Sequence, residues 1–236
     1  PILGSAFAII VVKQLFGGLG CNFANPAITG RVFLLLSFAG DMTTWVKPFY
    51  YHGLSIGNQL SSSAGSLDLD AVTSATPLVT GTESLSNLFL GNVGGCIGET
   101  SALALLLGGL FLIFTRVISP STPIAYLGSL GILTFFHALA TGGSLTEVPY
   151  ALLSGGVMIG AFFMATDYVT TPITTKGKWI FGIGCGILTF VIREFASMPE
   201  GCSFSILLMN LLTPYIDKFT MTKPLGAKPI KQKEEA

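Results

Sequence analysis

Apolar runs that recur along the whole chain, separated by short polar breaks, constrain its fold more than any other feature. There are seven of them: residues 1–14, 26–39, 101–119, 123–140, 151–167, 179–195 and 203–219. Crossing a bilayer takes a helix of about 17 to 25 apolar residues. A helix is required because each backbone donor in lipid must find its acceptor inside the same segment. The sequence therefore predicts an all-α integral membrane protein, folded as a polytopic helical bundle.

The composition agrees with this prediction. Half of the 236 residues are hydrophobic and only 10% are charged, and the mean hydropathy is +0.71. Soluble domains carry about 25% charged residues. The first run starts at Pro1 and has neither a basic start nor a small-residue cleavage site, so it is not a signal peptide. We expect the chain to begin inside a longer protein.

The positions of lysine and arginine predict the orientation, because cytoplasmic loops carry the excess of basic residues. Basic residues follow the last run and lie in alternate loops counted back from it: Lys223, Lys228, Lys231, Lys233, Lys176, Lys178 and Arg116. Lys47 is the only lysine or arginine in residues 41–100. We therefore expect a cytoplasmic C-terminus and an outer-face segment at 41–100. The basic tail is interpreted as a topology anchor and not as a nucleic-acid site.

Two glycine-rich breaks, residues 17–26 and 91–100, each precede an apolar run. Interrupted hydrophobic segments at matching places are typical of inverted-repeat membrane folds. On this interpretation residues 1–40 end a first transmembrane half, and 41–100 form an outer-face loop. Five helices in residues 101–219 form the second half, and 220–236 form a cytoplasmic tail. The first half would then need about three more helices upstream, about ten in all.

A polar island at residues 70–78 interrupts the apolar chain, with the sequence Asp-Ala-Val-Thr-Ser-Ala-Thr-Pro-Leu. Pro77 disfavours the α conformation for Thr76, so the Thr76 hydroxyl should be held out from an extended backbone, where it can be esterified. The spacing resembles the flavinylation motif Asp-x-x-Ser/Thr-Gly/Ser-Ala-Thr, whose last threonine receives FMN as a phosphoester from a flavin transferase. Thr73 and Ser74 stand where Ser-Gly is usual, and either could be modified instead. The alternative is a plain Ser/Thr loop.

Further segments extend this resemblance. The glycine-rich stretch at 16–31, Gly-Glu-Thr-Ser at 98–101 and Ala-Thr-Asp at 165–167 with Thr171-Pro172 look like RnfD, in the same order. The chain is thus identified as a member of the NqrB/RnfD family, which has ten helices. The resemblance implies a subunit of an Rnf-type translocase that transfers electrons between ferredoxin and NAD, coupled to movement of Na⁺ or H⁺.

The resemblance also implies the location, cofactors and partners. The protein would lie in the cytoplasmic (inner) membrane of a prokaryote and carry FMN covalently on Thr76. A second flavin such as riboflavin is a further expectation. Its partners would be the other Rnf subunits and the flavin transferase.

Ionisable residues in a membrane need a reason, since each costs about 2.5 to 3.5 kcal/mol at the bilayer centre. Glu99 could contact the flavin or an ion path, or it could cap a helix N-terminus. Asp167 is either a place where a cation enters or a solvated helix end. Asp70 either serves recognition by the transferase or caps a turn.

Other polar residues are expected to be structural. Arg31 is expected to reach the inner surface along its own side chain. His137, deep in the fourth run, is expected to be a hydrogen-bonded packing residue, while Glu147 and Glu200 have no partner visible in the sequence.

Several kinds of site are not expected. The cysteines Cys21, Cys96, Cys185 and Cys202 show no Cys-x-x-Cys pair, so we expect small packed residues and no metal site within this chain. No phosphate-binding glycine loop is present, so we expect no NAD site on this chain. No catalytic triad is present either.

Three alternatives remain open. The chain could be an NqrB-like subunit of a sodium pump that reduces quinone. It could be a non-redox transporter or channel with an inert Thr76 loop, or a scaffold that only seats neighbouring subunits.

Overall fold

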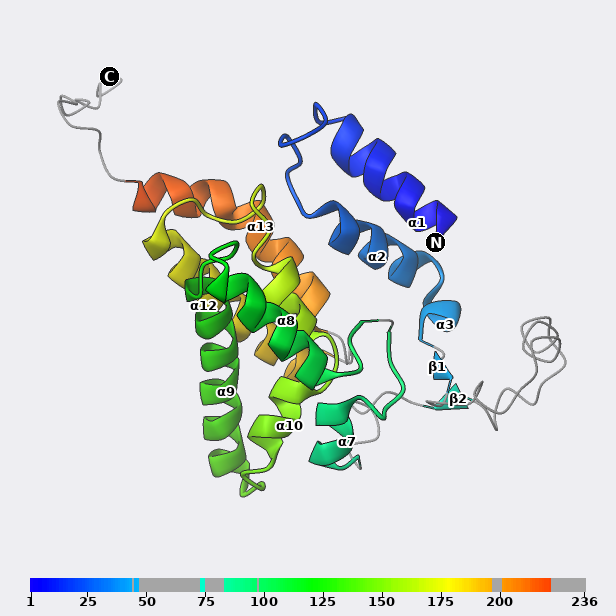
Figure 1. Cartoon of the computed structure of the whole chain (residues 1–236), viewed down its shortest axis with the longest axis vertical. Helices are drawn as coiled ribbons and strands as arrows, with labels where there is room; N and C mark the ends of the chain where they lie inside the picture. The colour runs from blue at the N-terminus through cyan, green and yellow to red at the C-terminus, as the bar shows by residue number, and fades with distance from the viewer. Residues whose placement is uncertain (44, 47–72, 75–82, 97, 197–200, 222–236) are drawn as a thin grey trace, which may run out of the picture.

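The computed structural model describes residues 1–43, 45–46, 73–74, 83–96, 98–196 and 201–221, and Figure 1 shows their arrangement. Helices joined by short loops make up nearly all of this part of the chain. In chain order they are α1 (Ile2–Ala6), η1 (Phe7–Gln14), α2 (Pro26–Ser37), α3 (Ala39–Met42), α7 (Leu85–Leu90), α8 (Ala102–Phe114), α9 (Ser121–Thr141), α10 (Glu147–Leu153), α11 (Val157–Ile159), η3 (Gly160–Met164), α12 (Thr175–Phe195) and α13 (Gly201–Thr220). Two short strands, β1 (Trp45–Val46) and β2 (Thr73–Ser74), form an antiparallel pair.

The long apolar helices confirm an all-α membrane protein. α9 and α12 have 21 residues each, and each contains an 18-residue apolar stretch, of mean hydropathy 1.5 in α9 and 1.2 in α12. Only 28% and 33% of these stretches is buried inside the protein. Large apolar side chains such as Phe136 and Ile180 therefore face outwards, where lipid would cover them. Shorter apolar helices span Ile2–Gln14, Pro26–Ser37 and Ala102–Phe114.

The fifth run is broken, so the prediction of one continuous helix over 151–167 is wrong. The helix starts earlier, at Glu147, and α10 bends by 64° against the helix Val157–Met164. Gly155 in the break has φ +63. Arg193 of α12 donates hydrogen bonds to the carbonyl oxygens of Ala151 (2.7 Å) and Ser154 (3.0 Å). The bend leaves these two carbonyl oxygens without donors from their own helix, and Arg193 supplies the missing donors. In lipid every backbone acceptor needs such a partner.

Close helix contacts hold α9 against α12. Gly182 and Gly186, one turn apart on α12, face α9, and a Cβ atom on Gly186 would lie 2.8 Å from the Tyr126 carbonyl oxygen. Small residues at this spacing let two backbones approach, which favours helix association in membranes. The main core lies beside this contact and includes Phe181 of α12, Ile206 of α13 and Ile28 of α2.

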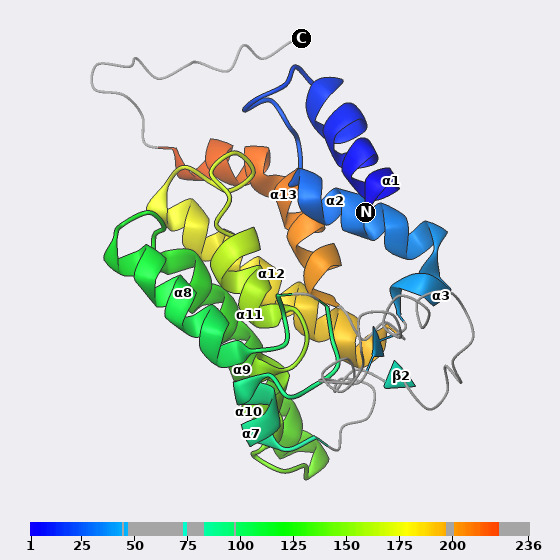
Figure 2. The same cartoon turned by 45° about the vertical axis from the view of Figure 1, so that its right-hand side comes forward.

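The N-terminal helices form a hairpin beside the bundle, with α2 between α1 and α13 (Figure 2). Gly4 and Gly30 permit the contact, since a Cβ atom on Gly30 would lie 2.9 Å from the Gly4 carbonyl oxygen. The Phe7 and Phe33 rings stack with centroids 4.0 Å apart.

Both glycine-rich breaks end in a capped helix. Asn25 accepts hydrogen bonds from the backbone of Ala27 and Ile28 at the start of α2, and Ser101 accepts one from Ala104 at the start of α8. The two helices have 12 and 13 residues, fewer than a full span needs. They fit the discontinuous helices that an inverted repeat would contain. The inverted repeat itself and the domain boundaries stay predictions.

The loops predicted to share the cytoplasmic side meet at one end of the bundle. The Tyr168 hydroxyl donates to the Val117 carbonyl oxygen. Asp217 accepts a hydrogen bond from the Ile173 backbone (3.1 Å), and Thr174 donates to Thr220 (2.7 Å). This arrangement agrees with the alternation of the loops. Which side of the membrane this end faces stays a prediction.

Candidate functional site

The flavinylation motif lies only partly in the described chain. Thr76 and Asp70 are outside the described residues. Thr73 and Ser74 form β2, which pairs with β1 in the register Trp45↔Ser74 and Val46↔Thr73. The centre of the motif therefore has an extended backbone held against the segment that follows α3.

Glu99 and Arg31, one from each glycine-rich motif, meet in the structure. The Arg31 Nη1 atom lies 3.8 Å from Glu99 Oε2, and the two side chains are 21% and 4% exposed. Arg31 Nη2 donates to the Cys96 sulfur at 2.9 Å. The second break therefore holds the Arg31 guanidinium, in keeping with the structural role expected of this residue, and its reach to the inner surface stays a prediction.

Glu99 does not cap α8, since Ser101 does. Its Oε1 atom instead accepts a hydrogen bond from the Cys96 backbone at 2.9 Å, which closes the turn of the break. Oε2 is buried and has no hydrogen-bond partner among the described residues. A buried acceptor without a hydrogen bond is uncommon and invites a ligand or a functional explanation.

A third break reaches the same carboxylate. A Cβ atom on Gly156, between α10 and α11, would lie 3.3 Å from Glu99 Oε2, a tight contact that would push this oxygen aside by a few tenths of an ångström. We call Arg31, Cys96, Glu99 and Gly156 the break junction. Within it, one carboxylate oxygen is bound to backbone and the other faces an arginine at the edge of ion-pair distance. Such a group can accept a cation or a proton in a medium of low dielectric.

A buried polar network lies on the other side of Gly156. The Cys202 thiol donates to the Gly156 carbonyl oxygen (3.3 Å) and accepts from the Tyr126 hydroxyl (3.1 Å). The Tyr126 oxygen lies 2.7 Å from the Thr189 hydroxyl, which is 2.7 Å from Ser205. Sequence reasoning missed this network, because hydroxyls spread over three helices leave no local pattern.

Asp167 belongs to a different polar cluster at the end of the bundle where the loops meet. Its Oδ2 atom accepts a hydrogen bond from Thr170 at 2.9 Å. With its amide in the orientation that satisfies both ends, Asn210 donates to the Thr170 carbonyl oxygen and accepts from the Asn25 backbone, each at 3.2 Å. Among the described residues, no hydrogen bond or ion pair links Asp167 to Glu99. The two candidates for the ion path, Glu99 and Asp167, therefore belong to separate clusters.

Three other expectations change. His137 packs edge-on against Phe190 with ring centroids 5.7 Å apart, but it is not deep, since its side chain is 35% exposed and its Nε2 lies 3.9 Å from Glu194 on α12. Glu147 has a partner: its Oε1 accepts from the Ser144 backbone at 3.1 Å. The Ser-x-x-Glu spacing of a capping box could have indicated this contact. Cys185 and Cys202 are buried as expected, but Cys21 is exposed. Glu200 lies outside the described residues.

Sequence comparison finds one matching family and several relatives. Residues 1–226 match the NQR2, RnfD, RnfE family. The D subunit of the Na(+)-translocating ferredoxin:NAD(+) oxidoreductase complex of Acetobacterium woodii is 46% identical, over 100% of this chain and 69% of the relative. The D subunit of the proton-translocating ferredoxin:NAD(+) oxidoreductase complex of Clostridium ljungdahlii is 42% identical, over 96% and 68%.

A third relative carries a more general name. The D subunit of the ion-translocating oxidoreductase complex of Stutzerimonas stutzeri is 40% identical, over 94% of this chain and 69% of its own length. The match to the family extends over nearly the whole chain, and it includes both glycine-rich breaks and the break junction. The chain therefore belongs to the NQR2, RnfD, RnfE family.

Proposed function

We propose that this chain is the D subunit of an Rnf-type complex, an ion-translocating ferredoxin:NAD⁺ oxidoreductase, and that it carries FMN covalently on Thr76. One observation carries the proposal: the whole chain aligns at 46% identity with a protein named as the D subunit of such a complex. The motif from Asp70 to Thr76 supports the attachment site. The complex would lie in the cytoplasmic membrane of a prokaryote.

The described part of the motif fits a flavinylated loop. The extended backbone of Thr73 and Ser74 agrees with the extended conformation that Pro77 predicts for Thr76. Bound FMN would supply one-electron transfer, and a phosphoester would keep it in place whatever its oxidation state. This chain's residues would position it, and Asp70 would serve recognition by the flavin transferase.

The break junction is our candidate for coupling to ion movement. Extra negative charge in a region of low dielectric attracts a cation strongly. Glu99 Oε2, buried and without a hydrogen bond among the described residues, is the group we propose to receive that cation, with Arg31 as the charge that it displaces. The named relatives are Na⁺-translocating in one case and proton-translocating in the other. Asp167, at the opposite cluster, is our second candidate for the path.

A denaturing gel under ultraviolet light tests the attachment site. The complex purified from cells that contain the flavin transferase should give a fluorescent band at the mass of this subunit. Thr76→Ala should abolish the band, whereas Thr73→Ser and Ser74→Gly, which preserve the motif, should keep it. Mass spectrometry that finds the Thr76 peptide unmodified in active, assembled complex would refute the proposal.

A second flavin such as riboflavin is part of the same proposal. Acid extraction should release a non-covalent flavin from the wild-type complex, and an equal amount from Thr76→Ala. Release of no flavin from either would reject this part and leave the covalent site untouched.

A non-redox transporter is the second candidate, because broken helices and a buried carboxylate also occur in transporters. A dark band from cells that express the transferase would favour it. An NqrB-type subunit would instead pass electrons to quinone, so the electron acceptor of the purified complex separates that alternative. Normal electron flux in Thr76→Ala would favour a scaffold.

A further inference from the structure

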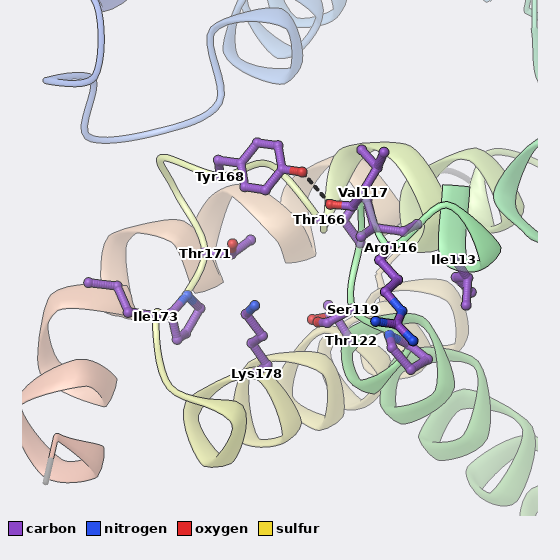
Figure 3. Close-up of a pocket in the computed structure, with 13 residues that line it drawn as sticks. Ile113, Arg116, Val117, Ser119, Thr122, Thr166, Tyr168, Thr171, Ile173 and Lys178 are labelled. Carbon is purple, nitrogen blue, oxygen red and sulfur yellow. Dashed lines mark hydrogen bonds between the residues drawn. The ribbon is translucent and has the colours of Figure 1, made fainter. Parts of the chain in front are cut away.

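A cavity of about 570 Å³ opens at the end of the bundle where the loops meet (Figure 3). Its walls come from the loop after α8, the loop before α12 and the first turn of α12. This volume lies in the range of sites that hold small molecules or head groups, about 300 to 1,000 Å³.

Two cations line the cavity, and no acidic residue does. Arg116 comes from the loop after α8 and Lys178 from α12. Figure 3 shows Lys178 extending into the hollow between Thr171 and Ser119. Within the described ranges, neither cation forms an ion pair with a carboxylate. Two positive charges therefore line the cavity without an ion-pair partner among the described residues, and Asp217 approaches the same loop only through the Ile173 backbone.

The backbone holds Arg116 at this place in an unusual conformation. α8 ends with the Val117 backbone donating to the Leu112 carbonyl oxygen (3.0 Å) and Arg116 donating to Ile113 (3.0 Å). This closure puts Arg116 at φ +58. Among the non-glycine residues of the described chain, Arg116 alone has a positive φ. Glycine normally takes this position, because a Cβ atom strains it. The strain is consistent with a use for the side chain.

The surroundings of the cavity are apolar and face outwards. Phe114, at the end of α8, is 81% exposed, and Tyr168 and Ile173, which line the mouth, are 75% and 78% exposed. Exposed aromatic residues at a helix end are typical of the level of the lipid head groups. A ligand with an anionic head and apolar chains would match both the cations and this rim.

We propose that this cavity binds the phosphate of an anionic phospholipid, with Arg116 and Lys178 as its cations. Its end of the bundle is the one predicted to face the cytoplasm, where basic pockets between membrane helices bind anionic head groups. Hydroxyls of Ser119 and Thr171 also line the cavity and could bond to phosphate oxygens. The acyl chains would lie along the exposed face of α8.

Native mass spectrometry of the purified complex, titrated with phosphatidylglycerol, tests the site. Each cation near an anionic lipid contributes about fivefold in affinity, so Arg116→Gln with Lys178→Gln should weaken the tightest binding step by about thirtyfold. Lys176→Gln is the matched control, since Lys176 is exposed on the same turn of α12 and does not line the cavity. It should bind lipid as the wild type does.

Two further arms identify the ligand. Phosphatidylcholine, which is zwitterionic, should bind at least tenfold more weakly than phosphatidylglycerol at this step. Inorganic phosphate at millimolar concentration should not displace the lipid, and displacement would show a site for free phosphate and overturn the proposal. Equal lipid retention by the double variant and the wild type would also overturn it. Size-exclusion chromatography of each variant establishes that the complex is intact.

Discussion

The α9–α12 contact and the break junction differ in how fully their polar groups are hydrogen-bonded. Between α9 and α12, glycines bring two backbones together, and the Tyr126 hydroxyl is surrounded by Thr189, Cys202 and Ser205. At the break junction, helix α2 and two helix breaks surround a carboxylate whose Oε2 atom has no hydrogen bond among the described residues. The difference indicates a rigid support beside a site that can still bind something. Removing a group should therefore affect stability in the first region and ion transport in the second.

Removal of the arginine from the break junction should have the largest effect. Arg31→Met leaves Glu99 buried without its cation, which should lower the free energy of unfolding by about 3 to 5 kcal/mol. Denaturant titration in mixed micelles measures it. The double variant Arg31→Met with Glu99→Gln should recover most of the loss. A double variant no better than the single one would contradict a charge-based explanation.

Filling the α9–α12 contact should come next. Gly186→Ala places a methyl group 2.8 Å from the Tyr126 carbonyl oxygen, so we expect a loss of about 1 to 3 kcal/mol. The control is Gly128→Ala on α9, where no atom lies within 4 Å of the added group. Gly128→Ala should change stability little in the same titration. Equal losses in both variants would mean that the contact is not tight.

The polar network should contribute less. Tyr126→Phe removes a hydroxyl shared by three partners and should lower the free energy of unfolding by about 1 to 2 kcal/mol. The control is Tyr215→Phe, because Tyr215 is 65% exposed. Ions moved per electron should stay normal in Tyr126→Phe. A drop in that ratio would place the network on the ion path and break the contrast between the two regions.

Glu99→Gln should have the opposite effect, with little loss of stability and a clear loss of coupling to ion movement. Glutamine keeps the shape and can still accept from the Cys96 backbone, so stability should change by less than about 1 kcal/mol. Ions moved per electron, measured in vesicles, should fall clearly. A normal ratio would exclude Glu99 from coupling while leaving its structural contacts in place.

The smallest effect is expected at His137. Its contact with Glu194 is long, at 3.9 Å, and both side chains are about one third exposed. His137→Ala should therefore change the free energy of unfolding by less than about 0.5 kcal/mol. A loss above about 2 kcal/mol would restore the idea of His137 as a deeply buried packing residue.

The hydrophobic pattern determined the membrane class and the approximate position of each long helix, because backbone hydrogen bonding in lipid leaves no alternative to helices. It did not show the bend before Val157. Gly155 and Gly156 look ordinary in a membrane helix, and the break is stabilised by Arg193, which lies far along the chain. A contact of that kind exists only after the helices pack.

Residue types at recognisable spacings were likewise enough to identify the family and to propose Thr76 as the attachment site, because a modifying enzyme recognises a local segment of the chain. The roles of Arg31 and Glu99 were decided only by tertiary structure. Each lies in a motif that the sequence made visible, yet their pairing requires α2 to pack against the second glycine-rich break, beside the break at Gly156. Charge and burial depend on which neighbours arrive in space, and no pattern along the chain contains that information.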